Sequence, residues 1–559
     1  MPKVISIGNQ GFEDIRKENR FYVDKTEFIR EWWESGDSIT LIMRPRRFGK
    51  TLNMDMLKCF FSNQYADRED LFEGLTIWKD EKYRSIQGTY PVIYLSFADV
   101  KQTNYADAVK KIKRILSDLY QQYVFLLQEN CMTEMQKRQF SEVSPQMDDV
   151  TAQCALQDLA HYLYRFYGKK VILLLDEYDT PMQEAYLYGY WKEFTAFIRS
   201  LFNATFKTNP YLERAMMTGI TRVSKESVFS DLNNLNVVTT TSTEYETCFG
   251  FSEEEVFQAL EERGMNNQKK LVKSWYDGFV FGNTHDIYNP WSITNFLDKK
   301  QVRPYWADTS SNSMIDELIR KASTDIKEKM EELLQGKEIV VNFDEQIVFE
   351  QLDQDENAIW SLMLVSGYLK AEQIEYRGVL LEPWYHLRIT NLETTAMFTT
   401  MFKGWFAKNQ SNYNQFMKAL LSDDIDAMNY YMNQIIMTTF SYFDVGQNEP
   451  ERFYHGFVLG LIADQTDIYE IRSNRESGFG RYDVMMIPKI KETKKYPAII
   501  MEFKVRNIKR EESLEDTVQT ALTQIKEKCY DAELYDRGLK KEEIHHYGFA
   551  FEGKKVLIG

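Results

Sequence analysis

Hydrophobic positions in the first part of the chain form short unbroken runs, separated by segments with helical spacing. The runs at 38–43, 90–97 and 171–175 are mostly apolar and rich in Ile, Val and Leu, which predicts strands buried on both faces of a sheet. Residues 109–119 place apolar side chains three or four positions apart, as an amphipathic helix does. Strands that alternate with helices predict an α/β domain with a mainly parallel sheet over residues 1–245.

The hydrophobic pattern changes twice in the remainder of the chain. Residues 246–335 have helical spacing, which begins at a capping box formed by Ser252 and Glu255. Residues 336–445 predict a small winged-helix-like module and a helical connector that is mostly spacer. Residues 446–559 return to an α/β order of one helix, three strands, one helix and two strands. We therefore predict two α/β domains joined by a largely helical middle.

Composition narrows the classes of function. The 559 residues are 43% hydrophobic, enough for several cores and, on length alone, roughly three or four domains. The net charge of -16 argues against nonspecific coating of nucleic acid, because such binding needs a basic face. Five widely spaced cysteines indicate neither a disulfide framework nor a CxxC zinc site. Since the N-terminus lacks a signal core and no apolar run nears the ~18 residues of a membrane span, we expect a soluble, cytoplasmic protein without a membrane partner.

A basic turn at residues 44–51, RPRRFGKT, joins the first predicted strand to the next helix. The first turn of a helix has unpaired N–H groups and the positive end of the helix dipole, so it binds anions. Gly49 lets the backbone approach a phosphate, Lys50 can reach the outer phosphates, and the Thr51 hydroxyl can ligate magnesium. Arg44 replaces the leading glycine of the usual GxxxxGK[ST] pattern. The turn alone is therefore also compatible with an ordinary basic loop.

An acidic pair follows the apolar run at 171–175, in the sequence LLLDEYDTP. Asp176 at the end of a buried strand can hold the magnesium ion, and Glu177 can orient or deprotonate the attacking water. A strand can also end in acidic residues simply because it has reached solvent. Together with the basic turn, however, this pair strongly favours nucleotide hydrolysis.

A polar strand end at 218–222, TGITR, offers a further contact for a nucleotide. A residue at this position could sense the γ-phosphate, and Arg222 could neutralise charge in the transition state. The alternative is that Arg222 is an ordinary surface arginine in a loop.

Three charged residues stand out in the last predicted domain. Glu502 and Lys504 lie two positions apart in the apolar strand AIIMEFKV and so share one face, near Asp483 on the preceding strand. Two carboxylates suit a hydrated magnesium ion, and a lysine beside them can activate water for attack on a phosphodiester. A cross-strand salt bridge is the simpler interpretation, but charges within an apolar strand need a reason.

Six segments stand out along the chain, in the order FYVDKTEFI, RPRRFGKT, LLLDEYDTP, TGITRVSKESVFSDLNNL, WYDGFVFG and YNPWSI. The same order is seen in the bacterial predicted AAA-ATPase-like family, which the chain resembles over nearly its whole length. That family is similar to archaeal-type signal-transduction ATPases, whose loops also lack the leading glycine and carry paired arginines. The resemblance implies binding of ATP with Mg²⁺, and a helical lid at residues 246–335. Because Pro45 removes one N–H from the loop, we hypothesise that Arg46 and Arg47 add charge around the phosphates.

The C-terminal domain resembles the PD-(D/E)XK nuclease superfamily, which implies a restriction-endonuclease-like α/β fold. Residue by residue, Asp483 matches the aspartate, Glu502 the (D/E) position and Lys504 the lysine. The resemblance implies that these three residues are catalytic and that the two carboxylates hold Mg²⁺, or alternatively Mn²⁺.

Helical residues on either side of these strands could complete this site. Glu451 and His455 are four positions apart and so share a helix face, and either could be a further metal ligand, as in some subfamilies. Gln524 lies on the following helix, where relatives among the recombination exonucleases carry a Gln-xxx-Tyr pair. The spacing from Gln524 to Tyr530 differs from that pair, so only Gln524 is retained as a candidate.

Two functions fit these observations. The first is an ATP-binding and ATP-hydrolysing protein coupled to a metal-dependent nuclease that acts on nucleic acid, which we expect to be DNA. The alternative is a signalling or switch ATPase whose C-terminal domain binds nucleic acid or protein without cleaving it. Residues 481–559 hold about as many basic as acidic residues, which leaves room for a modest basic groove. An oligomer is compatible with either function.

Overall fold

The structure, a computed structural model, forms two compact units. Unit 1 comprises Met1–Ser311 and Glu338–Thr395, and unit 2 comprises Asn312–Lys337 and Ala396–Gly559. The boundaries predicted between the four domains stay predictions. The structure describes residues 2–207, 209–221, 229, 232–307, 313–334, 336–345, 355–405, 410–439, 468–477, 480–489, 496–508, 510–553 and 555–559.

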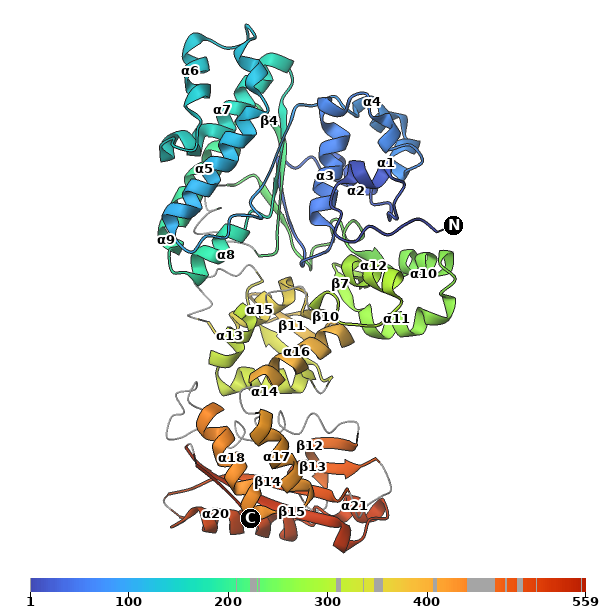
Figure 1. Ribbon diagram of the computed structural model, residues 1–559, viewed down its shortest axis with the longest axis vertical. Helices are drawn as coiled ribbons and strands as arrows, with labels where there is room; N and C mark the ends of the chain where they lie inside the picture. Colours follow the sequence, from blue (N-terminus) through green and yellow to red (C-terminus); the bar gives the residue numbers. More distant parts are fainter. Residues whose placement is uncertain are drawn as a thin grey trace. The chain divides into compact units, whose positions relative to one another are not determined.

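A parallel five-stranded sheet forms the centre of unit 1, as the alternation of strands and helices predicted. Figure 1 shows α5, α7 and α9 over one face of this sheet and α3 with the short N-terminal helices over the other. In spatial order the strands are β2 (Val92–Ser96), β3 (Val171–Asp176), β4 (Leu212–Gly219), β1 (Ile39–Met43) and β5 (Leu235–Val238). The helices are α1 (Phe12–Lys17), α2 (Glu27–Ser35), α3 (Lys50–Phe61), α4 (Glu81–Ile86), α5 (Tyr105–Gln121), α6 (Glu134–Glu142), α7 (Asp149–Tyr167), α8 (Thr180–Leu187) and α9 (Trp191–Phe202).

The central strands of this sheet are buried along their whole length. Every residue of β1 and of β3 is buried, which explains their unbroken apolar sequences. Met43 at the end of β1 pairs with Gly219 at the end of β4, and Ser96 pairs with Asp176. The carboxyl ends of four strands therefore meet at one edge of the sheet.

A helical segment with a small antiparallel sheet follows in unit 1. Ser252 accepts from the Glu255 N–H and the Glu255 side chain accepts from the Ser252 N–H, so the predicted capping box is confirmed. Its elements are β6 (Phe251–Ser252), α10 (Glu253–Glu262), α11 (Lys269–Tyr276), β7 (Phe279–Phe281), β8 (Thr284–Tyr288) and α12 (Pro290–Lys299).

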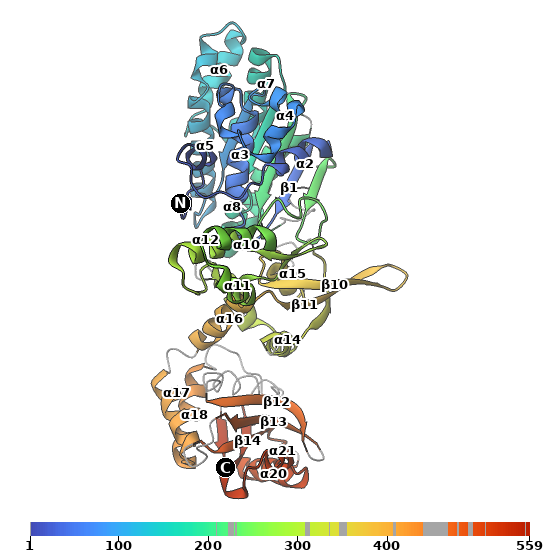
Figure 2. The same ribbon diagram turned by 90° about the vertical axis from the view of Figure 1, so that its right-hand side faces the viewer.

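The last part of unit 1 is a helix with a three-stranded antiparallel sheet in the order β10-β11-β9. Figure 2 shows the β10–β11 ribbon extending away from the helices around it. The winged-helix-like arrangement predicted for this part of the chain stays a prediction. The elements are β9 (Ile339–Asn342), α15 (Ala358–Val365), β10 (Leu369–Arg377) and β11 (Glu382–Ile389).

Unit 2 contains a mixed five-stranded sheet in sequential order, in which only the β14–β15 pair is parallel. This confirms the predicted C-terminal α/β fold, although the helix predicted over 451–463 lies outside the described residues. The strands are β12 (Tyr469–Ser477), β13 (Gly480–Pro488), β14 (Ala498–Val505), β15 (Ile544–Glu552) and β16 (Lys555–Ile558). The helices are α13 (Ser313–Lys321), α14 (Thr324–Leu334), α16 (Leu392–Trp405, from Ala396 onward), α17 (Gln410–Leu421), α18 (Ile425–Thr439), α20 (Leu514–Glu527) and α21 (Ala532–Asp536).

Helices cover both faces of the second sheet. On one face, α17 and α18 pack against Val484, Met486 and Met501. On the other face, α20 and α21 pack against Met485 and Ile500. The sequence predicted residues before 445 as mostly spacer, which is wrong for α17 and α18 because their apolar faces belong to this core. No helix in the described part of the chain combines the length and the hydrophobicity of a membrane span.

Two asparagines of α18 bind the edge strand β16. The Asn429 side chain donates to the Ile558 carbonyl (2.7 Å) and accepts from the Ile558 N–H (2.8 Å). Asn433 makes the same pair of bonds with Val556 (2.9 and 3.2 Å). Each side-chain amide thus makes the two hydrogen bonds that a peptide group of a neighbouring strand would make. The N–H and carbonyl groups of Val556 and Ile558 are therefore not available for pairing with another chain.

We expect the double variant Asn429→Ala/Asn433→Ala to lose about 2 kcal/mol of unfolding free energy, because two backbone donors and two acceptors lose their partners. Urea unfolding followed by circular dichroism would measure the change. Asn414→Ala on α17 is the matched control, since Asn414 is exposed. Equal stabilities of the double variant and the control would contradict this account.

Candidate functional site

The predicted phosphate loop, residues 44–51, turns at Gly49, which has a φ of +81° and precedes the first residue of α3. A left-handed residue at this point favours glycine. Lys50 Nζ donates to the carbonyls of Arg44 (2.7 Å) and Pro45 (2.8 Å). Burial lowers the pKa of Lys50 to about 8, although nearby carboxylates, including Glu177, oppose this shift. The Lys50 ammonium group therefore lies inside the loop, as the position of Lys50 in the sequence predicted.

Thr51 and Asp176, the two predicted magnesium ligands of this site, are in direct contact. Thr51 Oγ1 donates to Asp176 Oδ2 (2.8 Å), and the Thr218 hydroxyl donates to Asp176 Oδ1. Asp176 is 1% exposed. A hydroxyl and a carboxylate at this separation are a donor set that fits Mg²⁺, which prefers oxygen ligands about 2.1 Å from the ion.

Glu177 has a φ of +50°, which is unusual for a residue with a side chain. The Glu177 N–H donates to Thr218 Oγ1 (3.2 Å), and Thr180 Oγ1 donates to the Glu177 carboxylate (3.1 Å). The next acidic residue, Asp179, is 1% exposed and accepts from the Thr221 N–H (2.8 Å) and hydroxyl (2.9 Å). Asp179 had no predicted role, although it belongs to the acidic motif DEYD at residues 176–179.

The three arginines of the loop have different environments. Arg44 is fully buried, donates to the carbonyls of Thr239 and Glu244, and lies 4.6 Å from the Phe281 ring centroid. Its side chain is therefore part of the core, which explains how arginine can stand where a glycine is usual. Arg46 and Arg47 are exposed. Their phosphate role stays a prediction, and Arg222 lies outside the described residues.

Residues of the predicted lid hold the loop within unit 1. The Phe48 ring packs on those of Phe279 (4.7 Å) and Phe281 (5.3 Å), and Arg47 lies over the Trp291 ring (4.6 Å). The sequence segments WYDGFVFG and YNPWSI supply these aromatic residues. Their contact with the phosphate loop appears only in the fold.

The C-terminal site lies where β13 and β14 pair. Val484 is opposite Met501, so Asp483 is next to Glu502. Asp483 Oδ2 accepts from the Phe503 N–H (2.7 Å), and Lys504 Nζ lies 3.0 Å from Glu502 Oε1. Burial raises the pKa of Asp483, while the Phe503 N–H and the Lys504 charge oppose the shift.

The helix α20 adds Gln524 to this group. Gln524 Nε2 donates to Glu502 Oε1 and to the Tyr530 hydroxyl (3.0 Å). Burial raises the pKa of Tyr530, and the hydrogen bond from Gln524 opposes this shift. The negative charges of Glu502 and Asp483 raise the pKa further, whereas the Lys504 charge lowers it. The fold thus brings Tyr530 to Gln524, which sequence spacing had not indicated. The candidate ligands Glu451 and His455 lie outside the described residues.

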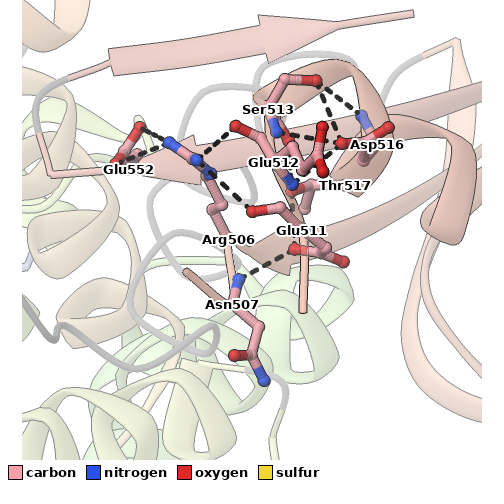
Figure 3. Close-up of polar contacts among 8 residues, drawn as sticks. All are labelled: Arg506, Asn507, Glu511, Glu512, Ser513, Asp516, Thr517 and Glu552. Carbon is pink, nitrogen blue, oxygen red and sulfur yellow. Dashed lines mark hydrogen bonds and ion pairs between the residues drawn. The ribbon is translucent and has the colours of Figure 1, made fainter. Parts of the chain in front are cut away.

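A network around Arg506 connects the end of β14 to the start of α20 (Figure 3). The Arg506 guanidinium binds both Glu552 oxygens (3.0 Å each) and the Glu512 carbonyl. Glu511 accepts from the Asn507 N–H and the Thr517 hydroxyl (2.8 Å each). These bonds link the strand that carries Glu502 to the helix that carries Gln524.

A separate acidic cluster lies in the predicted lid. Carboxylate oxygens of Glu253, Asp277 and Asp286 lie within 4.8 Å of one another, and Lys273 forms ion pairs with all three. The ammonium group compensates part of this negative charge. Burial and the neighbouring Asp286 raise the pKa of Asp277 to about 7.

This shift predicts a pH dependence of stability. Between the ordinary pKa of 3.8 and about 7, the folded protein holds a proton on Asp277 that the unfolded chain releases. The unfolding free energy contributed by this group therefore falls as pH rises through that window. From pH 5 to pH 8, the unfolding free energy should fall less in Asp277→Asn than in wild type. Urea unfolding at the two pH values would measure both changes. Asp298→Asn, on the exposed surface of α12, should behave as wild type, and equal losses in all three proteins would refute the prediction.

Comparison with known proteins agrees with both resemblances. Residues 6–229 match the predicted AAA-ATPase family, and residues 449–559 match the PD-(D/E)XK nuclease superfamily. The chain is also 26% identical, over 98% of its length and 96% of the relative, to "Uncharacterized protein in vnfD 5'region" of Azotobacter chroococcum mcd 1. The chain therefore combines a domain of the predicted AAA-ATPase family with a C-terminal domain of the PD-(D/E)XK nuclease superfamily.

Proposed function

We propose that the protein is an ATPase whose nucleotide state controls a metal-dependent nuclease domain acting on DNA. The observation that carries the proposal is that each domain brings a lysine together with acidic residues, at the carboxyl ends of the strands in unit 1 and where β13 and β14 pair in unit 2. In unit 1 these are Lys50 and Asp176, with the Thr51 hydroxyl. In unit 2, Lys504 and Glu502 lie beside Asp483. Both groups suit chemistry at a phosphate.

At the nucleotide site, Lys50 would exchange the carbonyls of Arg44 and Pro45 for the outer phosphates of ATP. Thr51 and Asp176 would hold Mg²⁺, which supplies neutralisation of phosphate charge when bound. Glu177 would orient and deprotonate the attacking water. Arg46 and Arg47, exposed on the loop, would add positive charge around the phosphates, and Arg222 would do so in the transition state.

At the nuclease site, Asp483 and Glu502 would hold a divalent cation, Mg²⁺ or Mn²⁺, which when bound polarises the scissile phosphate. Lys504 would orient and activate water through its position beside Glu502. Gln524 would fix the Glu502 carboxylate by its hydrogen bond. Glu451 and His455 stay candidates for completing the metal shell. All five cysteines are unpaired, which is consistent with our proposal of a cytoplasmic location.

Lys50→Ala should weaken ATP binding at least tenfold and abolish hydrolysis, because the outer phosphates lose their cation. Equilibrium binding of labelled ATP and phosphate release would measure both effects. Lys58→Ala, on the same helix, is the control, since Lys58 is paired with Asp55. Wild-type turnover by the Lys50 variant would refute the nucleotide site.

Asp483→Asn should reduce metal-dependent cleavage of DNA at least about 100-fold while leaving ATP hydrolysis in place. Gel assays with single- and double-stranded DNA and RNA, with Mg²⁺ or Mn²⁺ and with or without ATP, would measure this. Glu515→Ala removes an exposed carboxylate from α20 and should cleave as wild type. If wild type cleaves none of these substrates, the nuclease proposal fails, and the switch ATPase that binds without cleaving replaces it.

A further inference from the structure

A chain of hydrogen bonds leads from the phosphate loop to the carboxyl group of Glu393. The Arg46 carbonyl accepts from Trp306 Nε1 (3.0 Å) and from Asn289 Nδ2 (3.3 Å). The backbone N–H of Trp306 donates to Glu393 Oε1 (2.6 Å). The Ser292 hydroxyl lies within hydrogen-bond distance of both Glu393 oxygens (3.1 and 2.8 Å). One carboxyl group therefore binds two of the elements that surround the loop.

This network is almost completely removed from solvent. Asn289, Ser292 and Glu393 are 0% exposed, and Trp306 is 1% exposed. A buried hydrogen bond is costly to break because water cannot replace the lost partner. The Asn289 side chain also accepts from the Trp291 and Ser292 N–H groups at the start of α12. The Arg46 carbonyl therefore cannot move far without disturbing the donors that bind it.

The network lies close to two points where the chain leaves unit 1. Trp306 is five positions before Ser311, at the end of the first segment of unit 1. Glu393 is two positions before Thr395, at the end of the second segment. Both exits lead into unit 2, which carries Asp483. The hydrogen bond between Trp306 and Glu393 therefore joins two segments that continue along the chain into unit 2.

We propose that Glu393 is a positioning residue that couples the nucleotide state of the phosphate loop to the segments entering unit 2. The inference rests on the proposed function, because it assigns a route by which ATP controls cleavage. When Lys50 exchanges the carbonyls of Arg44 and Pro45 for phosphates, the adjacent Arg46 peptide shifts. The Trp306 and Glu393 groups then shift with it, because packed buried groups have few alternative arrangements.

A purely structural role makes a different prediction from coupling. A network that only stabilises unit 1 would lower the unfolding temperature when it is altered, but ATP would still change cleavage by the wild-type factor. Coupling requires that this factor itself depends on Glu393. Linkage adds a second readout, because DNA must change the affinity for ATP by the same factor as ATP changes the affinity for DNA.

Glu393→Gln and Trp306→Phe test the route at two points. Glu393→Gln places an amide NH₂ beside the Trp306 N–H and the Ser292 hydroxyl, which both donate to the carboxyl group. Trp306→Phe keeps an aromatic ring but removes the N–H that donates to the Arg46 carbonyl. ATP should change wild-type cleavage about fivefold or more, and the ratio should fall to near one in both variants. ATP should also change the DNA dissociation constant of wild type, DNA should change the ATP dissociation constant by the same factor, and both effects should be absent in the variants.

Glu246→Gln is the matched control, because Glu246 accepts from a backbone N–H (Asn283, 2.6 Å) and a hydroxyl (Thr284, 2.7 Å) as Glu393 does. It should keep the wild-type ratio. If Glu393→Gln or Trp306→Phe folds, binds ATP and keeps the wild-type ratio, the inference is overturned. A wild type with both activities but no effect of ATP on cleavage overturns the inference alone. A wild type without ATP binding or cleavage also overturns the proposed function.

Discussion

The parallel pairing of β1, β3 and β4 is the constraint on which the proposed nucleotide site of unit 1 depends. Parallel strands bring their carboxyl ends to one edge of the sheet, so residues far apart in the sequence arrive at the same place. The loop after β1, Asp176 at the end of β3 and Thr218 near the end of β4 meet there. The hydrogen bonds of Asp176 with Thr51 and Thr218 follow from this register. Few other elements are needed to assemble the centre of the site.

The second sheet also brings together residues that are far apart in the sequence, but through antiparallel pairing. Antiparallel pairing of β13 and β14 places Asp483 beside Glu502, and the helix α20 closes over them with Gln524. A buried charge is tolerated only when other groups compensate it. Asp176 has two hydroxyl donors, and Glu502 has the Lys504 ammonium and the Gln524 amide. Both sites therefore hold acidic groups in a form that a metal ion and a phosphate could use.

The aromatic segments around the phosphate loop explain its unusual sequence. Arg44 packs in the core against Phe281, while Phe48 lies between Phe279 and Phe281. In this fold the loop is held by side chains on its outer side as well as by its own backbone. A leading glycine is therefore not required to shape the turn, whereas Gly49 has a φ of +81°, which favours glycine.

The sequence by itself determined most strands of the two α/β domains, the helices between them and the charged motifs, because apolar runs, helical spacing and capping residues are local properties. It did not indicate the β6–β8 sheet, which lies within residues predicted as helical. It also indicated Asp176 and the Asp483, Glu502 and Lys504 group, since charges beside buried strands need an explanation. Only the tertiary structure decided that α17 and α18 cover the second sheet. It also brought Tyr530 to Gln524 and Glu393 to Trp306. A local pattern shows that a helix has an apolar face, but the surface that covers this face comes from distant residues.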